Sequence, residues 1–361
     1  MKIADEFKDI MSELGDLRIK ESELKKSRIE SQYEDLQRRQ KEIEKNKSLD
    51  VSGMQDSSVS KIQDQIGDYF KQAKNSQIFL NDSFKGKIPM FARNLIFIGA
   101  ESGNGKSTIV ANLAFSAISQ KGCKKILIIT NEEHTTDVYN RITCLIKQWN
   151  YSSDHSSFTD EQVAEFIRMV GVLSKRITVV DDSFGDSSGV TTTLEGMQSV
   201  FDKLVTDKAE YDMILIDYYQ NVDYSSKNPE LNEYQVQERF ARYLDIFKNR
   251  YNAPIVLLGQ LKPYDDEKTP FKLRIEGRKT IYNASTTCVE VQRDTPNHRS
   301  KFIIRKSRFP AALGEEIMVG FDKGKLVKYD SEFASRVEAY KMSIQTQDIL
   351  KMKMERNGEK G

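Results

Sequence analysis

The sequence is poor in the residues that hold small secreted or metal-stabilised proteins together. Its 361 residues include three cysteines and three histidines, and neither set has the spacing of a disulfide framework or a metal site. We therefore expect each cysteine to be a small buried residue in a reducing compartment. The chain also lacks an apolar run of membrane-spanning length and a signal-peptide pattern at its start. These absences predict a soluble, cytoplasmic protein with no membrane partner.

A charge excess of one sign is missing as well. Lysine and arginine number 55 and aspartate and glutamate 54, which leaves a formal charge of +1. Any contact with nucleic acid must therefore come from a local basic patch and not from the field of the whole molecule. The length is sufficient for one large α/β domain with an appendage.

Residues 1–46 contain no proline and repeat apolar side chains at steps of three and four, with one slip of phase. This pattern predicts a long helix with a coiled-coil or helical-hairpin seam; a lone solvated helix is the alternative. Residues 47–58 have the composition of a flexible linker. Residues 59–75 follow as a short amphipathic helix, and residues 331–361 as a helical and then flexible tail.

A glycine-rich loop follows the apolar run Leu95–Gly99. It consists of Ala100, Glu101, Ser102, Gly103, Asn104, Gly105, Lys106, Ser107 and Thr108. This is a P-loop between a predicted strand and a predicted helix, with Ala100 in place of the usual first glycine. Its backbone N–H groups would surround phosphates, Lys106 would contact the β- and γ-phosphates, and the Ser107 hydroxyl would bind Mg²⁺. The alternative is an ordinary glycine-rich turn.

From residue 76 to residue 330 apolar strands alternate with helical stretches. This order predicts an α/β domain with a mostly parallel central sheet. The expected strands are 95–99, 125–130, 177–180, 213–217, 254–259, 287–292 and 302–306, followed by a hairpin of 316–319 and 326–329.

Three of these strands end in residues that suit nucleotide chemistry. The strand at 213–217 ends in Asp217, as in a Walker B motif, and this carboxylate would hold Mg²⁺. The strand at 125–130 is followed by Glu132 and Glu133, one of which would polarise the attacking water. Glu132 is preferred because alternation directs only one of the two at the site, and a solvated helix start is the alternative. Gln260 closes the fifth strand, where an amide can hydrogen-bond a γ-phosphate.

Late in the chain, Arg305-Lys-Ser-Arg308 places cations at a strand end. Lys306 and Arg308 share one side of an extended backbone, which suits a phosphate supplied across a subunit boundary. A basic, solvated strand end explains the pattern equally well.

Taken in order, the P-loop, Thr130-Asn-Glu-Glu, Leu215-Ile-Asp-Tyr-Tyr-Gln, Leu258-Gly-Gln-Leu and Lys306-Ser-Arg resemble the DnaB-type replicative helicases and the helicase half of phage primase–helicases. The resemblance implies a RecA-like domain that hydrolyses ATP or another NTP with Mg²⁺ at the interfaces of a homohexameric ring. It also implies that single-stranded DNA passes through the ring, in a bacterial host cytoplasm if the chain is phage-encoded.

The resemblance assigns roles to individual residues. Glu132 would be the catalytic base, Gln260 the phosphate sensor, and Lys306 with Arg308 the fingers reaching a neighbouring site. Arg293 and Phe321 would sandwich the base. Helix 59–75 would dock on the adjacent subunit, while residues 1–46 would contact a primase, a loader or another replisome protein.

DNA contacts are expected from two loops, 223–233 and 262–274. Their candidate cations are Lys227, Lys262, Lys268, Lys272 and Arg274. A recombination ATPase of the RecA or RadA type and a ring ATPase that binds no DNA and recruits proteins through its coiled coil are the competing hypotheses.

Overall fold

The computed structural model describes residues 80–361 with gaps, together with the helical residue Gly67. The gaps are 86, 89, 91–92, 121–122, 124, 152–156, 183–189, 218–231, 252, 264–268, 276–278, 309–312 and 359–361. The chain divides into two compact units, Met1–Asp68 and Tyr69–Gly361. The predicted coiled-coil-like segment, linker and docking helix lie outside the described residues, Gly67 apart.

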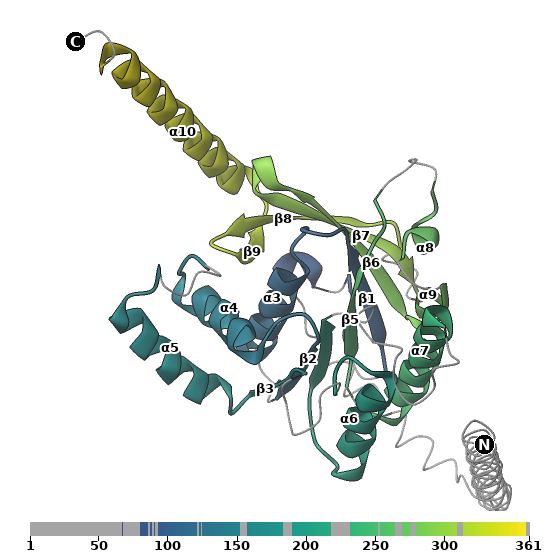
Figure 1. Ribbon diagram of the computed structural model, residues 1–361. Coiled ribbons are helices and arrows are strands. Elements are labelled where there is room, and N and C mark those ends of the chain that lie inside the picture. Colours follow the sequence, from purple (N-terminus) through teal and green to yellow (C-terminus); the bar gives the residue numbers. More distant parts are fainter. Residues whose placement is uncertain are drawn as a thin grey trace, which may run out of the picture. The chain divides into compact units, whose positions relative to one another are not determined.

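The second unit is built on a nine-stranded sheet with the order β3-β2-β4-β5-β1-β6-β7-β8-β9 (Figure 1). The strands are β1 (Leu95–Ala100), β2 (Ile126–Thr130), β3 (Ile177–Val180), β4 (Met213–Asp217), β5 (Ile255–Gln260), β6 (Thr287–Asp294), β7 (Arg299–Ser307), β8 (Glu316–Asp322) and β9 (Lys325–Lys328). The first six pair in parallel, and β7, β8 and β9 continue the sheet antiparallel. The prediction of an α/β domain with a mostly parallel sheet is confirmed.

Helices cover both faces of the sheet. The longer ones are α3 (Lys106–Ser119), α4 (Thr135–Lys147), α5 (Asp160–Leu173), α6 (Leu194–Thr206), α7 (Glu233–Arg250) and α10 (Ser331–Gly358). The short ones are α8 (Phe271–Arg274), α9 (Lys279–Ala284) and the 3₁₀ turns η2 (Asp82–Phe84) and η5 (Thr295–Asn297). Figure 1 shows α3, α4 and α5 on one side of the sheet and α6, α7 and α9 on the other.

Successive side chains of the buried strands point to opposite faces of the sheet, so two hydrophobic cores form. In β1, Ile96 and Ile98 pack with the α3–α5 layer, whereas Leu95 and Phe97 pack with the α6–α7 layer. The parallel strands are buried on both faces, and they are therefore continuously apolar instead of alternating with polar residues. The same strand order brings the carboxyl ends of β1, β2, β4 and β5 to one edge, where a ligand of a wound sheet binds.

The antiparallel part differs from the prediction at its ends. β7 begins at Arg299, three residues before the expected strand, because Arg299, Ser300 and Lys301 pair with the polar end of β6. Lys323 and Gly324 form the two-residue turn between β8 and β9, both with positive φ, as a tight hairpin requires.

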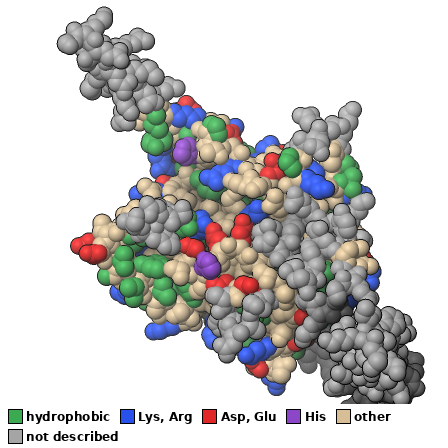
Figure 2. All heavy atoms as spheres, viewed as in Figure 1, with side chains coloured by type: hydrophobic (Ala, Val, Ile, Leu, Met, Phe, Trp, Pro, Cys, Tyr) green, Lys and Arg blue, Asp and Glu red, His purple; other side chains and the backbone are tan. Residues whose placement is uncertain are grey.

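The three cysteines are buried and free within the described part of the chain, as expected. No helix among the described residues is both long and apolar enough to cross a membrane. On α5, Val163, Ile167 and Val172 are exposed apolar residues, and Figure 2 shows green side chains gathered over this helix.

Candidate nucleotide-binding site

The P-loop connects β1 to α3 in the conformation that phosphate binding requires. Gly103 and Gly105 have φ of 76° and 82°, a region that disfavours residues with a Cβ. Gly105 is the N-cap of α3, and no side chain among the described residues caps this end. The first N–H groups of α3 and the positive end of its helix dipole therefore lie at the loop, an arrangement that suits an anion.

Asp217 lies at the end of β4, beside the start of α3. Its side chain is 3% exposed and hydrogen-bonded to Ser107, with Lys106 close enough to act on it electrostatically. Desolvation, reinforced by the charges of Glu132 and Glu133, raises the pKa of Asp217 to about 7.

These residues fit a magnesium ion. Asp217 Oδ1 is buried and has no hydrogen-bond partner among the described residues, so the site holds an oxygen that a cation would satisfy. The described residues contain no cluster of three or more His, Cys, Asp or Glu side chains able to hold a metal. A site with one carboxylate and one hydroxyl suits Mg²⁺, which takes its remaining ligands from phosphates and water.

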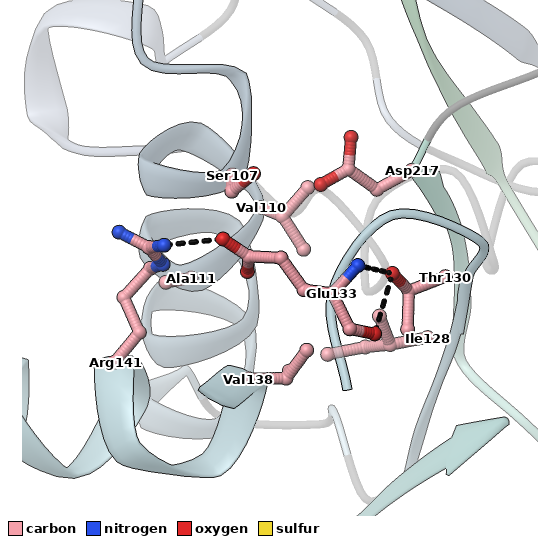
Figure 3. A pocket seen from close by; sticks show the side chains of 9 residues that line it. All are labelled: Ser107, Val110, Ala111, Ile128, Thr130, Glu133, Val138, Arg141 and Asp217. Atoms are coloured by element: carbon pink, nitrogen blue, oxygen red, sulfur yellow. Dashed lines mark hydrogen bonds and ion pairs between the residues drawn. The ribbon is translucent and has the colours of Figure 1, made fainter. Parts of the chain in front are cut away.

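The two glutamates after β2 have different surroundings. Thr130 Oγ1 accepts hydrogen bonds from the backbone N–H groups of Glu132 and Glu133, at 3.3 and 3.0 Å. Glu133 points into a small pocket that Ser107 and Asp217 also line, and it forms an ion pair with Arg141 of α4 (Figure 3). Glu132 is exposed.

Gln260 is the last residue of β5 and pairs in register with Ala100, the first residue of the P-loop. The next residue, Leu261, donates its backbone N–H to Ala100 O at 3.0 Å. The amide expected to sense phosphate therefore lies on the strand beside the P-loop.

Arg293 and Phe321 also meet above the P-loop. The Arg293 guanidinium carbon lies 4.9 Å from the centre of the Phe321 ring, and a Cβ added to Gly105 would come within 3.2 Å of Arg293 Nη1. The two side chains thus contact each other next to the phosphate loop, and a base could enter between them only if they separated.

The two cations expected to act together at the end of β7, Lys306 and Arg308, lie in different environments. Lys306 is half-buried, and its Nζ donates to the carbonyl oxygens of Tyr282 and Asn283 at the end of α9. Desolvation lowers the pKa of Lys306. Arg308 is exposed. Lys306 is therefore bonded to the backbone of its own chain, whereas Arg308 is exposed to solvent.

Among the expected DNA contacts, Lys262 and Lys272 are exposed. Lys227 and Lys268 lie outside the described residues. Arg274 was expected on the loop surface but is 1% exposed. Glu101 and Glu290 bind its guanidinium in ion pairs. Because a buried, paired guanidinium cannot contact a phosphate of DNA, the expectation for Arg274 is wrong.

The sequence analysis assigned no role to three residues of this region: Arg141, Glu290 and Arg305. Glu290 gave a signal, since a carboxylate inside an otherwise apolar strand must find buried partners. Arg141 and Arg305 gave none, because nothing in a helix or a strand pattern shows which arginine meets which acid.

The family model of the DnaB-like helicase C-terminal domain matches residues 80–308, more than half of the chain. The chain belongs to this family. The DnaB-like domain thus contains the P-loop, Asp217, both glutamates, Gln260 and Arg308.

Solved structures show the same fold. One of them, an ATPase domain, matches with a TM-score of 0.59 at 14% identity, over 76% of this chain and 100% of that one. A DnaB-like replicative helicase, studied with its interactions with primase, matches with a TM-score of 0.56 at 14% identity, over 76% and 68% of the two chains. No curated protein matches the chain.

Proposed function

We propose that this DnaB-like protein is an ATP-driven single-stranded DNA translocase that acts as a replicative helicase in a homohexameric ring. The observation that carries the proposal is the convergence of Lys106, Ser107 and Asp217 at the edge of the sheet, with Glu132 beside them. Family membership supplies the link from a nucleotide site to helicase action.

Each residue has a defined task in this proposal. The N–H groups of the P-loop and Lys106 bind the triphosphate. Ser107 and Asp217 would hold Mg²⁺, which neutralises charge on the phosphates when bound. Glu132 orients and polarises the attacking water, since Glu133 is engaged by Arg141. Gln260 contacts the γ-phosphate from β5.

In the ring, a neighbouring subunit supplies an arginine to the nucleotide site. An exposed arginine at the end of β7 has the chemistry of a finger that stabilises charge developing on a neighbour's γ-phosphate. Arg308 takes this role, and Lys306 maintains the position of the β7 end through its bonds to α9. Lys262 and Lys272 contact the DNA backbone without reading sequence. Residues 1–46 contact a primase or loader.

Unwinding of a forked DNA duplex tests the proposal. With ATP and Mg²⁺ the wild-type protein should release the labelled strand, and Lys106→Ala should release none. DNA-stimulated hydrolysis without strand release would favour a recombination ATPase, whereas hydrolysis that ignores DNA would favour a regulatory ring ATPase. Either result would contradict the helicase assignment.

A further inference from the structure

Arg274 connects the P-loop to the middle of the sheet. One amino group, Nη2, donates to Glu101 Oε1 at 2.6 Å, and the other, Nη1, donates to Glu290 Oε1. Glu101 is the second residue of the P-loop, and Glu290 lies on β6. A single buried guanidinium therefore joins the loop that would bind phosphate to a strand on the far side of β1.

Glu290 extends the connection to β7. Its Oε2 accepts from Arg305 Nε at 2.6 Å, and its Oε1 also accepts from Gln292 Nε2 at 3.1 Å. Glu290 is 1% exposed, so both of its oxygens are satisfied inside the protein. Because Arg305 lies three residues before Arg308, the network ends beside the exposed cation at the end of β7.

Arg274 also closes the base of the loop that follows β5. Its backbone carbonyl accepts from Lys262 N at 2.7 Å, and its Nε donates to Lys262 O at 3.1 Å. Leu261 and Ile275 form an antiparallel bridge next to this pair. The exposed lysines of the loop, Lys262 and Lys272, are thus carried by a segment whose base is bonded to the P-loop.

Folding stability alone does not require these buried ion pairs, because apolar side chains of similar volume often stabilise the fold equally well. A buried guanidinium instead provides hydrogen bonds of fixed direction and a positive charge. Glu101 is the accessible member of the network, with 34% of its side chain exposed. A polyphosphate bound in the P-loop would add negative charge beside Glu101, and this repulsion would act on the ion pair between Glu101 and Arg274.

We propose that Arg274 is a positioning residue that couples phosphate occupancy of the P-loop, through Glu101, to the placement of Lys262 and Lys272, the exposed lysines that would contact DNA. The inference rests on the proposed function, since the ligand of these lysines is single-stranded DNA. By linkage, nucleotide then changes DNA affinity by the same factor by which DNA changes nucleotide affinity.

The test is the ratio of the dissociation constants for a fluorescent oligo(dT), measured with and without a non-hydrolysable ATP analogue. We expect a ratio of roughly 5- to 150-fold in the wild-type protein, the usual range for coupled sites. In Glu101→Ala the ratio should fall below about 2-fold. Glu165→Ala is the matched control, since Glu165 pairs with Lys147 and Arg168 far from the P-loop, and it should keep the wild-type ratio.

Arg274→Met gives a second measurement of the same ratio, with a thermal melt to show that the variant folds. If Arg274 had a purely structural role, Arg274→Met would change the melting temperature and leave the ratio of dissociation constants unchanged. A wild-type ratio in Glu101→Ala overturns the coupling while DNA binding stands. A wild-type protein that binds no oligo(dT) overturns the proposed function itself, and the coupling with it.

Discussion

The guanidinium of Arg293 lies over the ring of Phe321, with 4.9 Å between the guanidinium carbon and the ring centre, beside Gly105 of the P-loop. Arg293 comes from β6 and Phe321 from β8, so two strands that do not pair with each other supply the two halves. We propose that a nucleotide base stacks on this side of the P-loop.

Removal of either half should weaken nucleotide binding. Stacking of a base on an aromatic side chain is worth about 1–3 kcal/mol, which corresponds to roughly 5- to 150-fold in affinity. We expect Arg293→Ala and Phe321→Ala each to raise the dissociation constant of a fluorescent ATP analogue within this range. Arg299→Ala, which removes a similar contact with Tyr329, should leave it unchanged. Equal effects of all three variants would contradict a base site at Arg293 and Phe321.

The raised pKa of Asp217 predicts a pH-dependent effect on stability. In the folded protein this pKa is about 7, against an ordinary value of 3.8. The folded state therefore retains a proton that the unfolded state has lost, and folding stability decreases as the pH rises from about 4 to about 7. The side chain of Asp217→Asn stays neutral, so the stability of this variant does not decrease in the same way as the pH rises.

Without nucleotide or Mg²⁺, Asp217→Asn should melt at least ~2 °C above the wild-type protein at pH 8. The difference should shrink as the pH falls toward 4, and calorimetry at several pH values measures it. Asp294→Asn should show the opposite sign, because hydrogen bonds from Asn297 and Arg299 lower the pKa of Asp294. A melting difference for Asp217→Asn that does not depend on pH would show that this carboxyl is ionised normally.

The two glutamates after β2 should differ in catalysis. Loss of a general base costs about 10²- to 10⁴-fold in rate, and we expect a loss of this size in the kcat of Glu132→Gln. Glu133→Gln, which weakens the pair with Arg141, should lose less than tenfold. Steady-state hydrolysis of both variants decides the assignment, and the reverse order would make Glu133 the base.

Arg308 should act on the neighbouring subunit's nucleotide. Arg308→Ala is expected to bind the ATP analogue normally but to lose roughly 10³-fold in hydrolysis. Co-expressed with Lys106→Ala, it should regain activity, because an intact P-loop in one subunit would then face an intact Arg308 in the next. Normal hydrolysis by Arg308→Ala alone, or no recovery in the mixture, would refute action across an interface.

The central fold was predictable because local signals agreed with one another. The buried parallel strands are short apolar runs, and the glycine-rich loop marks the junction of β1 and α3. The extra length of β7 was not predictable, since Arg299, Ser300 and Lys301 are polar and join the sheet only through pairing with β6.

The positions of the candidate site residues were predictable where these residues lie at strand ends. Asp217, the two glutamates and Gln260 follow apolar strands, and parallel strands bring such ends together. The burial of Arg274 was not predictable, because in the sequence Arg274 is one more cation in a lysine-containing loop. Its burial depends on Glu290, a residue on another strand. Lys306 likewise appeared to be a surface cation, and only the position of α9 shows its bonds to backbone carbonyls.

ATP hydrolysis with and without single-stranded DNA tests whether the protein is a DNA-dependent motor. The mass of the protein should be measured in the same buffer with nucleotide present. We expect a species of hexamer mass whose hydrolysis is strongly stimulated by DNA and is abolished in Lys106→Ala. Hydrolysis by the wild-type protein at a rate that DNA does not change would contradict this expectation.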